Sequence, residues 1–345
     1  MPTWNDSTHF CNWTGVICGL RHKRVVTLNL WSGGFSGSVS PAVGNLSFLR
    51  ELFLHNNSFT GSVPHEVGKL SRLRRLGLSN NSLSGEITSN ISQCLNLLEL
   101  DLSGNDFIGV IPNEFEELNK LLFINLHSNN LTGEIPKFIG NFTFLQFISG
   151  LGNNLQGNIP DTLGHLSNMW FFGFASNNLS GILPPSFFNI SSLTNIDLPN
   201  NQIGGTLPAD IAIRFPGLKS LNLPINKLTG PIPVSLSNAS NLKLLVLNEN
   251  AFTGSVPSFD RLERLTRFAV NENQLGNGKS DDLDFVSSLA NCSKLSILGF
   301  SANNLGGWHD SGFNWESKKC RCNVSQRKFV IRPYTVFIGE SLSTE

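Results

Sequence analysis

The sequence predicts an α/β repeat solenoid of about twelve units, with a parallel β-sheet on its concave face. The first observation is an asparagine that recurs mostly every 24 residues, with final intervals of 23 and 30. The second is an earlier copy of the unit that carries Gly33 in the same place. A unit this short cannot bury its own apolar face, so we expect neighbouring units to stack into one elongated domain. The recurring positions are Asn57, Asn81, Asn105, Asn129, Asn153, Asn177, Asn201, Asn226, Asn250, Asn273 and Asn303.

Each unit begins with a short predicted strand, such as Leu52-x-Leu54. Alternating leucines give such a strand one buried face, which parallel copies stacked side by side can share. Because adjacent strands lie about 4.8 Å apart, twelve of them would form an inner surface roughly 55 Å long. Glycine and proline, as at Gly133 and Pro136, then end the regular pairing, and a returning segment completes the unit on the outer side. Period and pattern together match the leucine-rich repeat, a right-handed superhelix.

The recurring Asn follows the strand, where the chain turns inward. Its amide can both donate and accept, so a stack of these side chains can satisfy backbone groups that the turn leaves unpaired. We therefore interpret the ladder as structural. A buried polar group without a partner costs about 1–3 kcal/mol, so Asn153→Leu should destabilise the chain although it adds apolar area.

Composition and motifs argue against several classes of function. The formal charge is zero and 14% of residues are charged, so no nucleic-acid partner is indicated. No apolar run reaches the roughly 18 residues of a membrane span, and the first six residues are too polar to open a secretory signal peptide. The chain has no nucleophile elbow, metal motif or phosphate loop, so we expect neither catalysis nor a cofactor.

The cysteines fall into three groups. Cys94 and Cys292 each precede a core Leu by three residues, so we expect both to be buried thiols that fill apolar space. Cys320 and Cys322 lie near the end of the chain, without the second pair that a zinc site needs. The remaining pair, Cys11 and Cys18, brackets a short segment before the first repeat.

These residues resemble a known family. Residues 11–18, Cys-Asn-Trp-Thr-Gly-Val-Ile-Cys, look like the N-terminal cap of plant leucine-rich-repeat receptor-like serine/threonine kinases, and the Leu-x-Gly-x-Ile-Pro core is the plant form of the repeat. Residues 226–238 and the insertion at 275–285 are similar to the subfamily that senses bacterial elicitors. Over residues 4–307 the resemblance implies a cell-surface ectodomain that binds a peptide or protein and recruits a co-receptor.

We expect three parts: a partial cysteine-bearing cap at 1–24, the solenoid at 25–307 and an off-pattern tail at 308–345. The family's signal peptide, cap helix, membrane span and kinase motifs are missing from the sequence, so we interpret the chain as a truncated receptor or a faulty gene model. An unusual C-terminal cap is the alternative. A small cap cannot hold itself by core burial, and the resemblance implies an oxidising compartment, so we expect a disulfide between Cys11 and Cys18. Two reduced thiols are the alternative there.

Counting from each Asn predicts which residues face the concave side. One column runs Glu51, Arg75, Glu99, Phe123, Phe147, Phe171 and Asn195. Its three consecutive aromatic residues, with Trp170 beside them, would form an exposed apolar patch of the kind that marks interaction sites. Gly150 and Gly173 should leave room beside the rings, and a ligand backbone could be oriented by Asn125, His127 and Ser149. Alternatively, the rings stack on one another and bind nothing.

Asn-x-Ser/Thr sequons are frequent, and five on the returning side are the best candidates for glycosylation: Asn45, Asn141, Asn189, Asn238 and Asn291. The function that the residues favour is recognition of a peptide or elicitor at the cell surface. One alternative is a secreted inhibitor of a cell-wall-degrading enzyme, which would favour a negatively charged concave face. The other is a truncated fragment with no function of its own.

Overall fold

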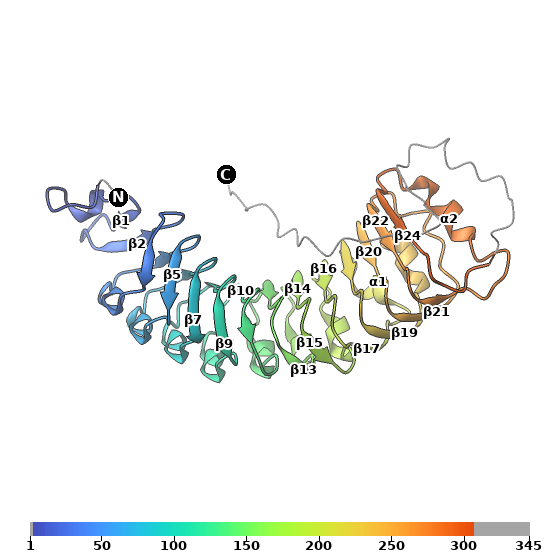
Figure 1. Ribbon diagram of the computed structural model, residues 1–345, viewed down its shortest axis with the longest axis horizontal. Coiled ribbons are helices and arrows are strands. Elements are labelled where there is room, and N and C mark those ends of the chain that lie inside the picture. Colours follow the sequence, from blue (N-terminus) through green and yellow to red (C-terminus); the bar gives the residue numbers. More distant parts are fainter. Residues whose placement is uncertain (1–2, 307–345) are drawn as a thin grey trace.

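One long parallel sheet lines the concave side of an arched solenoid (Figure 1). The computed structural model describes residues 3–306, and within them this sheet has 13 strands. Twelve are parallel and one per repeat, which confirms the predicted repeat solenoid, while β1 pairs antiparallel with β2. The strands are β1 Val16–Cys18, β2 Val25–Asn29, β4 Glu51–Phe53, β6 Arg75–Gly77, β8 Glu99–Asp101, β10 Phe123–Asn125, β12 Phe147–Ser149, β14 Phe171–Gly173, β16 Asn195–Asp197, β18 Ser220–Asn222, β20 Leu244–Val246, β22 Arg267–Ala269 and β24 Ile297–Gly299.

Short strands after each turn form a second, interrupted layer. It consists of three separate parallel sheets, so pairing stops between β11 and β13 and is reduced to a single bridge between β15 and β17. These strands are β3 Ser36–Ser38, β5 Ser58–Gly61, β7 Ser82–Glu86, β9 Asp106–Gly109, β11 Asn130–Leu131, β13 Gln156–Asn158, β15 Asn178–Ser180, β17 Gly204–Thr206, β19 Lys227–Pro231, β21 Ala251–Gly254 and β23 Gln274–Leu275.

The returning segments on the convex side are mostly single turns of 3₁₀-helix. Most begin directly after a proline, which cannot continue a sheet ladder. They are η2 Pro41–Asn45, η3 His65–Lys69, η4 Ser89–Gln93, η5 Asn113–Glu117, η6 Lys137–Asn141, η7 Asp161–His165, η8 Pro185–Asn189, η9 Val234–Asn238 and η10 Leu289–Asn291, with η1 Phe10–Asn12 in the cap and two short α-helices, α1 Ile211–Arg214 and α2 Asp284–Ser288.

The core is a continuous stack of leucine, isoleucine and phenylalanine side chains between these layers. Leu52, Leu76 and Leu100 pair in register across β4, β6 and β8, and each is at most 1% exposed. Cys94 and Cys292 lie in this core, as predicted, and burial raises the pKa of the Cys94 thiol to about 12. Stacking therefore buries the strand faces that a single repeat could not cover.

The Asn ladder joins each repeat to the one before it. At Asn153, Oδ1 accepts a hydrogen bond from the Leu131 amide at 2.9 Å, while Nδ2 donates to the carbonyls of Leu126 and Gly150 at 3.0 and 3.1 Å. The same arrangement recurs from Asn57, which accepts from the Phe35 amide, to Asn303. These side chains satisfy the backbone at the inward turn, which is the structural role that the sequence predicts.

A carboxylate organises the insertion in the eleventh repeat. Asp282 is 5% exposed and accepts hydrogen bonds from the backbone amides of Asn277, Gly278, Lys279 and Gly306, with shortest distances of 2.9–3.1 Å. These donors, that of Gly306 foremost, hold the pKa of Asp282 below its usual range. The carboxylate thus ties the start of the insertion to the last described residue of the solenoid.

We expect Asp282→Asn to loosen this loop by about 2 kcal/mol, because a neutral amide replaces a charged acceptor. In the wild type the contribution is complete above the usual carboxyl pKa of about 3.9 and is lost as the pH falls through the lower pKa of the folded state. Hydrogen exchange of the amides at 277–279 measures both effects. The exposed neighbour provides the control: Asp281→Asn should leave the exchange rates unchanged, and equal rates in the two variants would contradict the prediction.

The predicted tail at 308–345, with Cys320 and Cys322, lies outside the described residues. The predicted cap at 1–24 contributes β1 to the long sheet, so its described part is continuous with the solenoid. Within residues 3–306, none of the helices has the length and apolar character needed to cross a membrane.

Candidate functional site

Three phenylalanine rings form a stack across neighbouring strands of the concave sheet. Phe123, Phe147 and Phe171 pair in register on β10, β12 and β14. Their ring centroids are 4.4 and 4.5 Å apart, with interplanar angles of 11° and 12°. Trp170 packs against Phe147 at 5.6 Å and against Phe171 at 5.8 Å, and is 39% exposed. We call these four residues the aromatic column.

The aromatic column is less open than the sequence suggests. All three phenylalanines are half-buried because each ring covers part of its neighbour. The expected room beside them is filled: a Cβ built on Gly173 would lie 2.5 Å from the Phe171 ring, and one built on Gly150 would lie 2.6 Å from the core ring of Phe174. The space beside each glycine is therefore taken by a phenylalanine ring of the protein itself and is not open to a ligand. A ligand could contact Trp170 and the solvent-exposed parts of the three stacked phenylalanine rings.

The polar residues predicted beside the column differ in accessibility. Asn125 and Ser149 are 8% and 6% exposed, and Asn125 Nδ2 donates to Ser103 Oγ at 3.2 Å, so little of either side chain is open to a ligand. His127 is half-buried, with its Nδ1 3.0 Å from Ser128 Oγ. Burial lowers the pKa of His127, although Asp101 opposes the effect. His127 is therefore a neutral imidazole near pH 7 and the most available polar group of the three.

Charged residues border the column on both sides. Arg75 is shared by two carboxylates, with its guanidinium 3.5 Å from Glu51 and 3.2 Å from Glu99. On the other side, Asp197 accepts from Asn222 Nδ2 at 2.6 Å, and burial raises the pKa of Asp197. Glu51, Arg75 and Glu99, which precede the phenylalanines in the same column, thus form a ladder of alternating charges that bounds the apolar patch.

A second aromatic cluster on the concave side was missed at the sequence level. Trp31 is 59% exposed and lies 6.4 Å from the His55 ring, which in turn lies 5.3 Å from Phe53. The His55 ring covers Gly77, and its Nδ1 is buried with no hydrogen-bond partner among the described residues. Counting from the Asn places Phe53 on this face, so the same register that found Phe147 could have found it.

Two hollows lie away from the column. An apolar cavity of about 400 Å³ at the N-terminal end is lined by Trp4, Trp13 and Phe48, among others. A polar hollow of about 620 Å³ on the side of the solenoid is lined by Thr132, Gln156 and several asparagines. Neither includes a residue of the aromatic column.

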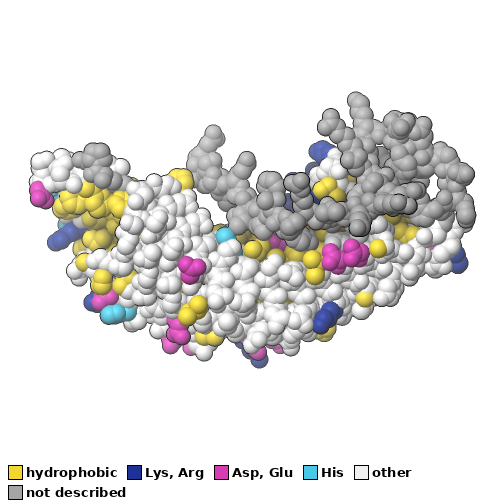
Figure 2. Space-filling model, viewed as in Figure 1, with side chains coloured by type: hydrophobic (Ala, Val, Ile, Leu, Met, Phe, Trp, Pro, Cys, Tyr) yellow, Lys and Arg dark blue, Asp and Glu magenta, His cyan; other side chains and the backbone are white. Residues whose placement is uncertain are grey.

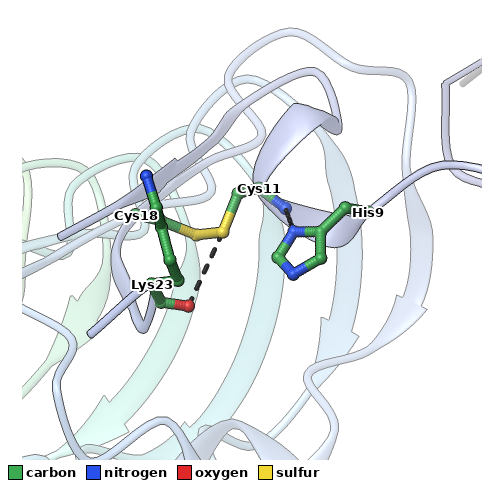
Figure 3. Close-up of a disulfide and its surroundings, with 4 residues drawn as sticks. All are labelled: His9, Cys11, Cys18 and Lys23. Carbon is green, nitrogen blue, oxygen red and sulfur yellow. Dashed lines mark hydrogen bonds between the residues drawn. A yellow bond between two sulfur atoms is a disulfide. The ribbon is translucent and has the colours of Figure 1, made fainter. Parts of the chain in front are cut away.

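The cap is closed by the disulfide between Cys11 and Cys18, which confirms the predicted pairing (Figure 3). The Cys11 amide donates to His9 Nδ1 at 3.2 Å, and Cys11 Sγ lies 3.6 Å from the Lys23 carbonyl oxygen. The bond therefore fastens η1 to the end of β1 at the start of the sheet.

The five predicted glycosylation sites share one environment. Each is the exposed last residue of a 3₁₀ turn on the convex side, so a glycan there would leave the concave face clear. Occupancy stays a prediction for Asn45, Asn141, Asn189, Asn238 and Asn291.

Comparison with known proteins agrees with this geometry. The Leucine Rich Repeat family matches residues 48–70, 72–94, 96–118 and 120–142. The LRR receptor-like serine/threonine-protein kinase EFR of Arabidopsis thaliana is 53% identical over 57 residues, which is 16% of this chain and 6% of that protein. The chain is a leucine-rich-repeat solenoid that resembles the ectodomains of plant receptor kinases. The region in common is a small part of the kinase.

Solved structures extend the likeness across most of the leucine-rich-repeat solenoid. The plant peptide hormone receptor RGFR1, solved in complex with RGF2, has a TM-score of 0.69 and 27% identity, and the match covers 79% of this chain and 52% of that one. A plant ice-binding protein has the same TM-score and 28% identity, with coverage of 76% and 85%. The two neighbours have different activities on one fold, so function has to be argued from the residues of the site.

Proposed function

We propose that this chain is the ligand-binding ectodomain of a plant cell-surface receptor kinase and that it recognises a peptide or protein on its concave face. The aromatic column carries the proposal. Trp170 and the stacked rings put apolar surface on a sheet whose other exposed positions are mostly polar, and large aromatic side chains are the usual anchors of an interface.

The ligand class is an extended peptide or a protein loop. The column is open and spans three strands, about 10 Å of sheet, so it suits a chain laid across the strands better than an enclosed small molecule. The similarity to a receptor solved with a peptide hormone supports this choice. A co-receptor ectodomain is part of the proposal because the family resemblance implies one.

The finer proposal is perception of a microbial elicitor in plant immunity. It rests on the resemblance of residues 226–238 and of the insertion at 275–285 to the elicitor-sensing subfamily. The insertion is an ordered feature of the solenoid, fastened by Asp282.

A peptide-capture experiment tests both the general proposal of peptide binding and the finer proposal of elicitor perception. The purified chain is incubated with a pool of bacterial peptides and, separately, with a pool of secreted plant peptides, and each captured sequence is resynthesised and titrated. We expect a discrete bacterial peptide with micromolar or tighter affinity, a binding free energy of about −8 kcal/mol. Capture from the plant pool alone would replace elicitor perception with hormone perception. If neither pool yielded a bound peptide and the chain inhibited a cell-wall-degrading enzyme, the proposed receptor function would be replaced by that of a secreted inhibitor.

A further inference from the structure

The strands that carry and flank the aromatic column hold charge of one sign. β8, β10, β12, β14 and β16 contain no Lys or Arg, and their charged residues are Glu99, Asp101 and Asp197. Glu99 is compensated by Arg75 on β6, whose guanidinium lies 3.2 Å away. Within residues 3–306, by contrast, no ion pair joins Asp101 or Asp197 to a cation. The two aspartates are therefore the uncompensated charges of this part of the concave face.

Asp101 and Asp197 occupy the same position on their strands and bracket the aromatic column. Asp101 on β8 pairs in register with Asn125 on β10, and Asp197 on β16 pairs with Gly173 on β14. Because adjacent strands are about 4.8 Å apart, four strand spacings separate the two carboxylates by about 19 Å. In Figure 2, hydrophobic side chains lie along the concave edge in the middle of the molecule, with acidic side chains near them. We call Asp101 and Asp197 the flanking aspartates.

Each flanking aspartate is half-buried and is held by neutral donors through one oxygen. Asp101 Oδ1 accepts from the Ser103 hydroxyl at 2.6 Å and from the Ser103 amide at 3.2 Å. Asp197 Oδ1 accepts from Asn222 Nδ2 at 2.6 Å. These hydrogen bonds fix the orientation of both carboxylates, and within the described part of the chain they leave Oδ2 of each to accept from a ligand.

The charge of the flanking aspartates acts on the groups around them. Burial raises the pKa of Asp197, because the ionised carboxylate is poorly solvated there. Burial lowers the pKa of His55 and of His127, and the charge of Asp101 opposes the effect at both rings. Both imidazoles are neutral near pH 7, so neither compensates Asp101. A ligand cation beside either aspartate would supply the missing compensation where water screens the attraction less than on an open surface.

We propose that the peptide bound on the concave face is cationic, with two basic groups that reach the flanking aspartates and an apolar stretch between them on the aromatic column. This inference rests on the proposed function and specifies the chemistry of its ligand. An extended peptide advances about 3.3 Å per residue, so basic residues about six positions apart match a span of about 19 Å. An acidic peptide is disfavoured, because its carboxylates would meet like charges on strands that offer no Lys or Arg.

The probe is the synthetic peptide Lys-Gly-Leu-Phe-Leu-Gly-Lys with blocked ends, titrated against the full chain at pH 7. Two matched peptides replace both lysines by Gln or by Glu, and a third keeps the composition but places the lysines next to each other at one end. We expect the spaced-lysine peptide to bind roughly tenfold more tightly than the Gln peptide, and the Glu peptide to bind most weakly. Salt should weaken binding of the spaced-lysine peptide more than that of the Gln peptide.

Substitution of the flanking aspartates separates charge from packing. Asp101→Asn and Asp197→Asn should each lower affinity for the spaced-lysine peptide roughly threefold to tenfold, because the amide keeps the size of the side chain and removes its charge. Affinity for the Gln peptide should stay unchanged, which also shows that the variants remain folded. The control is Asp106→Asn, an exposed carboxylate on β9 outside the concave sheet, which should affect neither peptide.

Several outcomes would overturn the inference. They are equal affinities for the spaced-lysine and Gln peptides, equal affinities for spaced and adjacent lysines, a loss as large in Asp106→Asn as in the flanking variants, and no binding of the spaced-lysine peptide. The proposed function is tested separately, by capture of a natural peptide. A captured peptide without basic residues, bound equally by the wild type and by Asp101→Asn and Asp197→Asn, would overturn the cationic ligand and leave peptide recognition standing.

Discussion

Asn153→Leu is expected to destabilise the solenoid by roughly 3 kcal/mol or more, although leucine is apolar and similar in size. The substitution removes the acceptor of the Leu131 amide and the donor to the Leu126 and Gly150 carbonyls. Asn153 is 8% exposed, so water cannot replace these partners freely. Urea unfolding followed by circular dichroism measures the loss as a lower midpoint.

The adjacent residue is the control for this prediction. Asn154 is exposed, and its amide donates at 2.6 Å to the side chain of Asn130 in the repeat before it. Asn154→Leu should therefore change stability by less than about 0.5 kcal/mol. If the two variants unfolded at the same denaturant concentration, the ladder would not be the stabilising device that its hydrogen bonds indicate.

Most of the architecture follows from the repeated sequence because each position of the repeat has one structural role. A fixed interval with Leu at alternate places sets strand register, and register alone brings Phe123, Phe147 and Phe171 side by side. The same counting places the convex turns, although their 3₁₀ geometry depends on how tightly the proline and the following residues bend the chain. Local rules were sufficient here since each repeat contacts chiefly its neighbours.

Features that depend on how side chains pack could not be predicted by counting the period. Period counting suggested open space at Gly173, but the ring of Phe171 turns onto its own strand and fills it. Asn125 and Ser149 are likewise buried, and the side chain of Asn125 donates to Ser103 in the repeat before it.

Phe147→Ser combined with Phe171→Ser is expected to abolish binding of the peptide that the wild type captures, with a loss of affinity of about a hundredfold or more, or roughly 3 kcal/mol. Phe147 is the central ring and contacts Phe123, Trp170 and Phe171, so its removal dismantles the column. The fold should persist because all three phenylalanines are half-buried and lie on the face of the sheet opposite the core leucines. Each lost aromatic contact should lower stability by about 0.5–1.5 kcal/mol.

The control removes as much apolar surface elsewhere. Phe144 and Ile182 are 57% and 56% exposed and lie outside the strands of the concave sheet. Phe144→Ser with Ile182→Ser should leave affinity unchanged, since an exposed residue outside the contact contributes little to it. Calorimetric titration of the three proteins, each first shown to be folded by circular dichroism, separates the cases. Wild-type affinity in a folded Phe147→Ser, Phe171→Ser protein would mean that the rings stack to satisfy one another and that the ligand binds on another surface. A loss confined to that protein would show that the exposed upper part of the stack and Trp170 act as the anchor.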